Sequence, residues 1–131
     1  MPPKDFWKHV TAFDIGSARD LRDSTLFDDI PCPATICDFN GLYIAVNPSF
    51  ASALGYERHE LEGVLTFWEL TPKEIQQESV IAIESAKNFG RFGWVEKQWQ
   101  HKNSGYVRGR VKGSLIVKNG KEFMFSIIDL Y

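Results

Sequence analysis

Apolar and polar residues alternate along several stretches of the chain, and this period of two predicts β-strands. Asn40-Gly41 separates two of these stretches, and Asn119-Gly120 separates another two. Asn-Gly between apolar runs is the strongest short signal for a β-hairpin. A third hairpin, with a longer loop, is predicted at Asn103-Ser104-Gly105. The pattern therefore predicts five strands, at about residues 34–39, 42–46, 92–101, 106–117 and 122–129.

A helical pattern replaces the alternation between the second and third strands. Asn47 can cap a short helix, with Pro48 at its first position and Gly55 at its end. Phe50 and Leu54 lie one turn apart on one face of this helix. A helix of under two turns is not stable alone. We therefore expect this face to pack against the sheet.

A longer helix is predicted over residues 72–89, with Thr71 as its cap, Glu74 completing a capping box and Gly90 stopping it. Its buried face would comprise Ile75, Ser79, Ala82, Ala86 and Phe89. Two weaker helical patches, Phe6–Phe13 and Arg19–Ile30, precede the first strand. Helices that all lie in one crossover of an antiparallel sheet must cover one face of it. The predicted fold is therefore α+β, with the helices on one face of a five-stranded antiparallel sheet.

Composition narrows the functional classes. The 131 residues suffice for one domain, and 15 basic against 17 acidic residues give a net charge of −2. That balance argues against nucleic acid or an anionic membrane as the main partner. No apolar run reaches the ~20 residues of a membrane span, and the first residues do not resemble a signal peptide. We therefore expect a cytoplasmic protein without membrane insertion, in which Cys32 and Cys37 are buried free thiols.

The sequence contains no recognisable catalytic or metal-binding motif. His9, His59 and His101 are scattered, without companions at metal-ligand spacing. The sequence contains no nucleophile elbow, no glycine-rich phosphate loop and no HExxH motif. We therefore predict a non-enzymatic domain with no catalytic residues and no metal site.

Five segments occur in an informative order: LFDDIPCPATICDFNGLYIAVNPSF at 26–50, LGYERHELEG at 54–63, FWELTPKE at 67–74, EKQWQHKNSGYVRGRV at 96–111 and IIDL at 127–130. Together they resemble a PAS domain, the sensor module of bacterial and eukaryotic signalling proteins. The resemblance implies the sheet order 2-1-5-4-3. It also implies a PAS sensor domain over residues 24–131, with an N-terminal helical extension over residues 1–23.

The resemblance further implies a sensory or regulatory module of a multidomain bacterial signalling protein. Such a module binds a small ligand, forms dimers, or does both, and so controls an output domain in cis that lies outside this chain. The usual outputs are a two-component histidine kinase and a diguanylate cyclase or phosphodiesterase. A ligand-free dimerisation scaffold and, less favoured, a flavin or haem redox sensor are the alternatives.

The identity of any cofactor stays open, but two subtypes of PAS domain are not expected. Light-sensing flavin PAS domains carry an Asn-Cys-Arg-Phe motif, and the corresponding region Val64–Trp68 has no cysteine for a photoadduct. Haem-binding PAS domains often use a histidine on the long helix, and residues 72–89 contain none. Trp68 or Trp94 could stack on a non-covalent flavin, although structural roles are favoured for both.

The fourth strand carries glycines on its apolar face, at Gly109 and Gly113. Glycine inside a strand marks either a close approach of backbone or missing side-chain volume, and both interpretations stay open. In the second, a ligand cavity lies between sheet and helices. Its candidate binding residues are Asn47, Phe50, Trp68, Ile75, Ser79, Ala82, Gly109, Val111, Gly113 and Leu115. Asn47 and Ser79 would be its polar contacts, although helix capping alone can explain Asn47.

An apolar stripe near the N-terminus is a candidate dimer contact. It consists of Phe6, Trp7, Val10 and Phe13 at helical spacing. PAS domains commonly pair through a helix before the first strand together with the outer face of the sheet. We therefore expect a homodimer of this kind, unless the stripe folds back on its own sheet.

Overall fold

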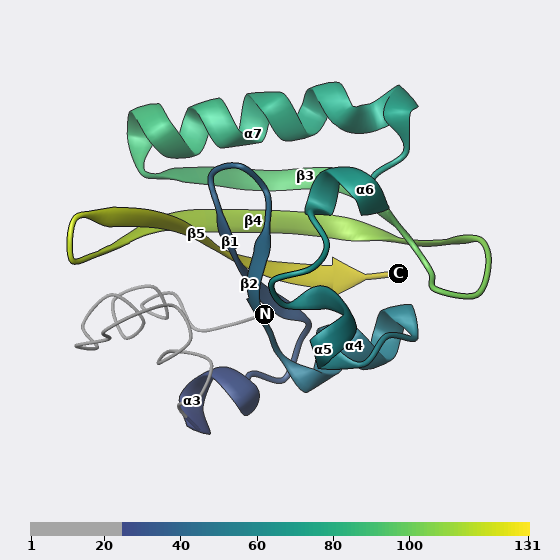
Figure 1. The fold of residues 1–131 in the computed structure, drawn as a ribbon. Helices are drawn as coiled ribbons and strands as arrows, with labels where there is room; N and C mark the ends of the chain where they lie inside the picture. Colours follow the sequence, from purple (N-terminus) through teal and green to yellow (C-terminus); the bar gives the residue numbers. More distant parts are fainter. Residues whose placement is uncertain (1–24) are drawn as a thin grey trace.

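One antiparallel sheet organises residues 25–131, the part of the chain that the computed structural model describes (Figure 1). Its strands are β1 (Ala34–Asp38), β2 (Tyr43–Val46), β3 (Arg91–Gln100), β4 (Tyr106–Lys118) and β5 (Lys121–Leu130). Their order is β2-β1-β5-β4-β3, as predicted. Each strand begins and ends within one residue of its predicted position. The predicted helical extension over residues 1–23 and its apolar stripe lie outside the described residues.

The turns explain why the strand boundaries are so regular. Asn119 and Gly120 both have positive φ, at 53° and 76°, which matches the twist of the strands they connect. At the β1–β2 turn, Gly41 has a φ of 97°. The Asp38 carboxylate there accepts hydrogen bonds from the backbone N–H groups of Asn40 and Leu42. Each turn therefore fixes the register of its hairpin locally.

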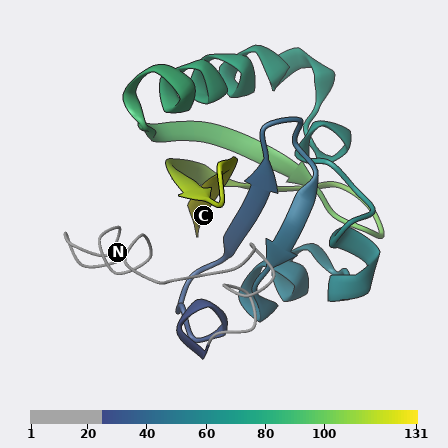
Figure 2. The ribbon, with the colours of Figure 1, turned by 60° about the vertical axis from the view of Figure 1, so that its left-hand side comes forward.

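Most of the described helices lie on one face of the sheet, and one short helix lies on the other. They are α3 (Thr25–Asp28), α4 (Pro48–Leu54), α5 (Arg58–Leu61), α6 (Phe67–Leu70), a 3₁₀ turn η1 (Lys73–Ile75) and α7 (Gln76–Phe89). Helix α7 runs alongside β3, and α3 lies at the opposite side of the domain (Figures 1 and 2). The crossover from α4 to α7 therefore covers one face, which we call the inner face. Helix α3 precedes the crossover and packs Phe27 against the other, the outer face.

The short helix α4 forms as its sequence predicts. The Asn47 side chain accepts a hydrogen bond from the Phe50 N–H at 3.0 Å. Gly55 ends the helix with a φ of 80°, and the next N–H, that of Tyr56, donates to the Ala51 carbonyl. Phe50 and Leu54 are both buried in the inner core. Tertiary packing thus supplies the stability that so short a helix lacks.

The predicted start of the long helix is wrong. Thr71 follows α6, and its hydroxyl donates to the Phe67 carbonyl at 2.6 Å. The capping box instead joins Thr66 and Glu69 at the start of α6. Both pairs share the spacing Thr-x-x-Glu, and the chain uses the earlier one. Helix α7 then begins at Gln76, after η1 and without a side-chain cap.

The buried face of α7 also differs slightly from the prediction. Ser79, Ala82 and Ala86 are buried as expected. Phe89 is 79% exposed, and Ile83 is buried in its place. Gly90 ends the helix with a φ of 81°, as predicted. Within residues 25–131, no helix is both long enough and apolar enough to span a bilayer.

Candidate functional site

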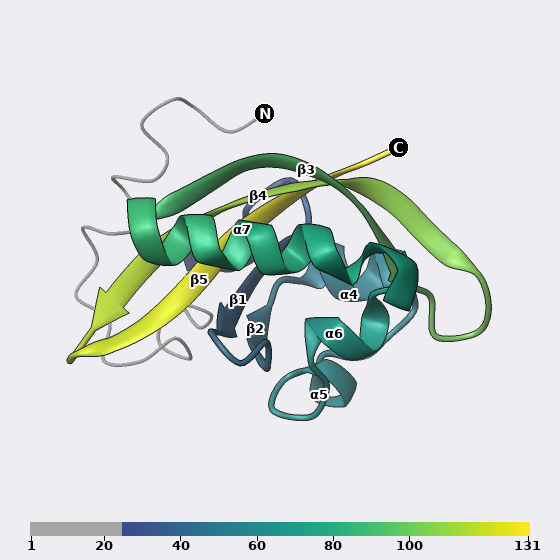
Figure 3. The same ribbon diagram turned by 90° about the horizontal axis from the view of Figure 1, so that it is seen from above.

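A cavity of about 40 Å³ lies between α7 and the inner face of the sheet, beneath the helix seen from above in Figure 3. One water molecule needs ~10–15 Å³ on this scale, so the cavity has room for about three or four non-hydrogen atoms. Its apolar lining residues are Phe67, Ala82, Ile83, Phe92, Val95, Trp99, Val111, Met124 and Ile128. Its polar lining residues are Thr35, Cys37, Tyr43, Ser79, Lys97 and Ser126.

The hydroxyl of Tyr43 is the least satisfied polar group in this cavity. Tyr43 is 1% exposed, and its ring packs against Phe50 with centroids 5.5 Å apart. Within residues 25–131, its hydroxyl is the one buried side-chain oxygen or nitrogen without a hydrogen-bond partner. Burial raises the Tyr43 pKa well above its usual value, so the hydroxyl keeps its proton. An unpaired buried hydroxyl costs about 1–3 kcal/mol, so a partner inside the cavity would stabilise the protein.

Lys97 enters the cavity because of its position on β3. Val95, Lys97 and Trp99 alternate along the strand, and this places the lysine side chain on the inner face. Its ammonium lies 4.6 Å from the centroid of the Phe67 ring and 5.7 Å from that of Trp99. Burial lowers the Lys97 pKa from 10.5 to about 8. The cationic form is therefore poorly solvated and is stabilised mainly by the aromatic faces.

Cys37 lines the cavity together with these two groups. It pairs with Tyr43 across the β1–β2 ladder, so both side chains lie on the inner face. Burial raises the Cys37 pKa from 9.0 to about 12, although the nearby Lys97 and a hydrogen bond from Thr35 act in the opposite direction. The thiol is therefore neutral at physiological pH and a poor nucleophile. Buried Thr35, Ser79 and Ser126 add hydroxyls that can donate or accept hydrogen bonds.

Three of the predicted binding residues line this cavity: Ser79, Ala82 and Val111. Contact between them and a ligand stays a prediction. Phe50 lies behind the Tyr43 ring and is not among the lining residues. Leu115 lies further along β4 and is only partly buried.

Asn47 has a structural role that occupies its whole side chain. Its Oδ1 accepts hydrogen bonds from the N–H groups of Ala34 and Phe50. Its Nδ2 donates to the carbonyls of Ile30 and Cys32. With 0% exposure it has no group left for a ligand, and it holds α4 against the start of β1.

Trp68 and Ile75 also lie away from the cavity. The Trp68 indole donates to the Asn40 carbonyl at 3.2 Å, which fastens α6 to the β1–β2 turn. Ile75 lines a separate surface depression with Glu78, Glu96, Gln98, Arg108 and Tyr131, and Lys97 borders both spaces. Trp94 packs with the outer core and lies under the Arg110 guanidinium at 4.2 Å. The tryptophans considered for flavin stacking therefore lie outside the cavity.

The space expected beside the two glycines is already filled. A Cβ added at Gly109 would lie 2.5 Å from the Asp129 carbonyl oxygen on the neighbouring strand. A Cβ added at Gly113 would overlap the Phe92 ring and lie 2.9 Å from the Ser126 hydroxyl. The close approach of backbone, the first of the two open interpretations, therefore holds for Gly109, whereas at Gly113 the missing side-chain volume is occupied by the Phe92 ring.

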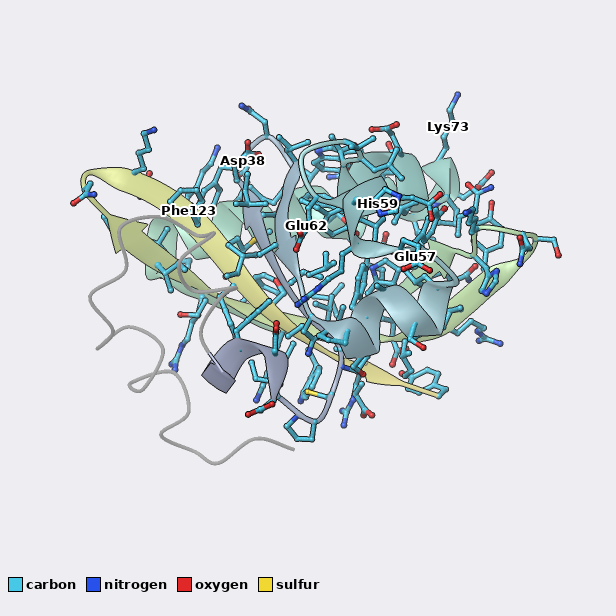
Figure 4. All side chains as sticks on the ribbon, turned by 60° about the horizontal axis from the view of Figure 1, so that its bottom comes forward. Asp38, Glu57, His59, Glu62, Lys73 and Phe123 are labelled. Carbon is cyan, nitrogen blue, oxygen red and sulfur yellow. The ribbon has the colours of Figure 1, made fainter. Side chains whose placement is uncertain are left out.

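Sequence reasoning placed Ser79 at the cavity but missed its two central polar residues, Lys97 and Tyr43. Lys97 carried a usable signal, because a lysine at the centre of Val95-x-Lys97-x-Trp99 falls on an apolar strand face. Tyr43 carried none, since a tyrosine at a strand start ordinarily reaches a hydrogen-bond partner. The two histidines within residues 25–131 lie away from the cavity: His59 is exposed on α5 (Figure 4), and the His101 ring packs against Gly55. Among the described residues, no group of His, Cys, Asp and Glu is arranged to hold a metal ion.

The strand order β2-β1-β5-β4-β3, with the helices α4 to α7 all in the crossover between β2 and β3, defines the class of α+β fold. A family model described as the PAS fold matches residues 27–88. Solved structures agree over most of the chain. The PAS domain of an HTR-like protein from Haloarcula marismortui is 20% identical, with a TM-score of 0.67 over 87% of this chain and 91% of that one. The described part of the chain is therefore a PAS-fold domain.

Two further neighbours show how widely this fold is used. A domain of a sensory box sensor histidine kinase/response regulator from Geobacter sulfurreducens is 21% identical, with a TM-score of 0.64 over 79% of this chain and 86% of that one. The PAS-B domain of Drosophila melanogaster Cycle, solved with bound glycerol, is 10% identical, with a TM-score of 0.66 over 76% of this chain and 99% of that one. No curated protein sequence matches the chain. These likenesses establish the fold.

Proposed function

We propose that the chain is a non-enzymatic sensory module of a bacterial signalling protein, with its ligand site in the cavity beneath α7. Occupancy of the cavity would favour one arrangement of α7 on the sheet and so bias an output domain in cis. The observation that carries this proposal is the unpaired Tyr43 hydroxyl in the wall of a cavity at the centre of the domain. A purely structural core has no need for that combination.

The neighbours favour a kinase as the output. Two of them are domains of sensor histidine kinases, one being the Geobacter sulfurreducens protein. A diguanylate cyclase or phosphodiesterase output remains the other candidate. The proposal includes a cytoplasmic location and a homodimer formed through the N-terminal segment and the outer sheet face. Light scattering of the full chain, compared with a chain lacking residues 1–20, tests the dimer; a monomer in both cases at high micromolar concentration would contradict it.

The cavity volume weighs against the cofactor alternative. Sites for drug-sized ligands and cofactors occupy roughly 300–1,000 Å³, whereas this cavity measures about 40 Å³. Haem or an isoalloxazine would require the inner core to open. A visible absorption spectrum of freshly purified protein tests this alternative directly, because either cofactor absorbs there.

Two alanines on α7 provide a matched test of the sensory proposal. Ala82 lines the cavity, and Ala86, one turn later, is fully buried in packed core. The larger valine at position 82 should occupy the cavity with little change in melting temperature. Ala86→Val should overpack the core and cost about 1–3 kcal/mol. The helix-propensity cost is common to both variants.

Native mass spectrometry of the full chain supplies the functional readout. We expect a small retained molecule, or one acquired from a metabolite mixture, in the wild-type protein and not in Ala82→Val. Equal destabilisation by the two valines, with no molecule bound to the wild-type protein, would leave the dimerisation scaffold as the better function.

A further inference from the structure

We infer that the cavity accepts the carboxylate of a short-chain monocarboxylic acid, held by the ammonium of Lys97 and the hydroxyl of Tyr43. This inference rests on the proposed ligand-binding function and specifies the chemistry of its ligand. The carboxylate would supply the acceptor that Tyr43 lacks and the negative charge that Lys97 lacks. The alkyl tail would lie against the apolar wall.

The first argument is the charge of the cavity. Lys97 is the one cationic residue among the lining residues, and no Asp or Glu is among them. Within residues 25–131, Lys97 forms no ion pair with a carboxylate. Lys97 is partly buried, and Glu78 and Glu96, which line the depression on its other side, form no ion pair with it. A partly desolvated cation without an ion-pair partner is costly, and an anion that enters beside it removes part of that cost. The site therefore favours an anion over a cation.

The second argument is the direction of hydrogen bonding. An ammonium group has only donors, and the Tyr43 hydroxyl has one donor that no described side chain or backbone group accepts. Both face the same cavity. A carboxylate is acceptor-only and has two oxygens, so one ligand group can satisfy both donors.

The third argument is the shape and polarity of the remainder. Ala82, Ile83, Val111, Met124 and Ile128 present only apolar atoms from α7, β4 and β5. An inorganic anion would make no apolar contact with this wall, whereas a short alkyl chain would pack against it. The volume of about 40 Å³ admits about three or four non-hydrogen atoms without rearrangement. Acetate, with four non-hydrogen atoms, matches this volume, and propionate adds one methylene to it.

The test is an NMR titration of the full 131-residue chain at pH 7 with sodium propionate. Propionamide, a neutral molecule of nearly the same shape, and sodium nitrate, an anion without a tail, are the matched ligands. We expect saturable shift changes at Ala82, Val111 and Met124 with propionate. Propionamide should bind at least about tenfold more weakly, the factor expected for loss of a charge-assisted hydrogen bond. Nitrate should not saturate the same signals.

Variants separate the two proposed contacts. Lys97→Met keeps the length of the side chain and should raise the propionate Kd at least about tenfold, and Tyr43→Phe should raise it about three- to tenfold. Lys121→Met replaces an exposed lysine on β5 and should leave the Kd unchanged. Should Lys97→Met fail to fold, Tyr43→Phe and the propionamide comparison still decide the matter.

The contrary outcomes are distinct. Equal binding of propionate and propionamide, or full affinity in Lys97→Met, would overturn the carboxylate and leave the sensory cavity standing with a neutral ligand. Equal saturation by nitrate would show a simple anion site and overturn the monocarboxylate. No response to any of the three compounds would also overturn it. The mass-spectrometric search for another retained molecule would then decide the sensory proposal separately.

Discussion

The outer core, where α3 packs against β1 and β5, is filled with apolar side chains, whereas the inner face combines apolar packing with a lysine, a tyrosine hydroxyl and a cavity. There, the rings of Phe27 and Phe125 meet edge to face with centroids 6.0 Å apart, and Ile36 of β1 is fully buried. Alternate residues of the same strand serve both faces, since Ile36 points outward and Cys37 inward. The difference indicates that the outer core supplies stability that allows the inner core to remain incompletely packed.

Phe125→Ala should produce the largest effect, because it empties the centre of the outer core. Truncation of a fully buried phenylalanine costs about 3–5 kcal/mol through lost burial and the cavity left behind. Urea unfolding followed by circular dichroism measures it. Phe89→Ala is the control, since Phe89 is 79% exposed and its loss should change stability by less than about 0.5 kcal/mol. A loss below 1 kcal/mol for Phe125→Ala would refute the assigned role of the outer core.

Gly109→Ala should cost about 1–3 kcal/mol, because the new methyl group meets the Asp129 backbone carbonyl, which cannot rotate away. Gly113→Ala meets mainly the Phe92 ring, which borders the cavity and can move into it. We therefore expect a smaller loss for Gly113→Ala than for Gly109→Ala in thermal denaturation. The reverse order would mean that the inner core does not yield toward its cavity.

Lys97→Met should stabilise the ligand-free domain by about 1 kcal/mol. It removes a poorly solvated charge, and this gain outweighs the loss of the aromatic contacts to Phe67 and Trp99. The exposed control Lys121→Met should be neutral. Chemical denaturation at pH 7 measures both. A destabilised Lys97→Met protein would show that the ammonium is well solvated or paired in solution, and the inner face would then resemble an ordinary core.

The pH dependence gives the smallest and most specific effect. The Lys97 pKa is about 8 in the folded protein and 10.5 in the unfolded chain, so the unfolded state binds more protons between these values. The free energy of unfolding should therefore rise from pH 8 upward. The Cys37 pKa is raised from 9.0 to about 12, and this makes stability fall above pH 9. The net rise should be confined to pH 8–9 and amount to less than about 1 kcal/mol.

Urea titrations between pH 7 and pH 9 test this window. The titratable or charged groups that border Lys97 are Cys37, Tyr43, Glu78, Glu96, Arg108 and Tyr131. Lys97→Met should show no rise, and Cys37→Ala should extend the rise beyond pH 9. An unchanged rise in Lys97→Met would assign it to another group.

The sequence predicted the strands well because local chemistry determines where they end. Asn119-Gly120 supplies the two positive φ values that a tight hairpin needs, and Asn47 with Gly55 determines both ends of α4. The start of α7 was wrong because two Thr-x-x-Glu patterns lie five residues apart. Only the packing of α6 shows which pair forms the capping box.

The candidate site was predicted less well for a geometric reason. The prediction looked for missing side chains, and the missing volume at Gly113 is taken up by Phe92 of the adjacent strand. A one-strand pattern cannot show this, because it depends on the β3–β4 register and the irregularity between Phe92 and Val95. The real cavity is instead marked by polar groups, Lys97 and Tyr43, on an apolar face.

Because Cys37 is buried in the inner core, the rate at which its thiol is alkylated reports how often that core opens. Its thiol is 2% exposed and stays protonated at neutral pH, so an alkylating reagent reaches it only when the inner core separates. Cys32, half-buried in the same chain, provides an internal standard. The ratio of labelling at the two cysteines then reports how often the core opens. An occupant of the cavity would slow the Cys37 reaction selectively, even if the occupant itself had never been identified.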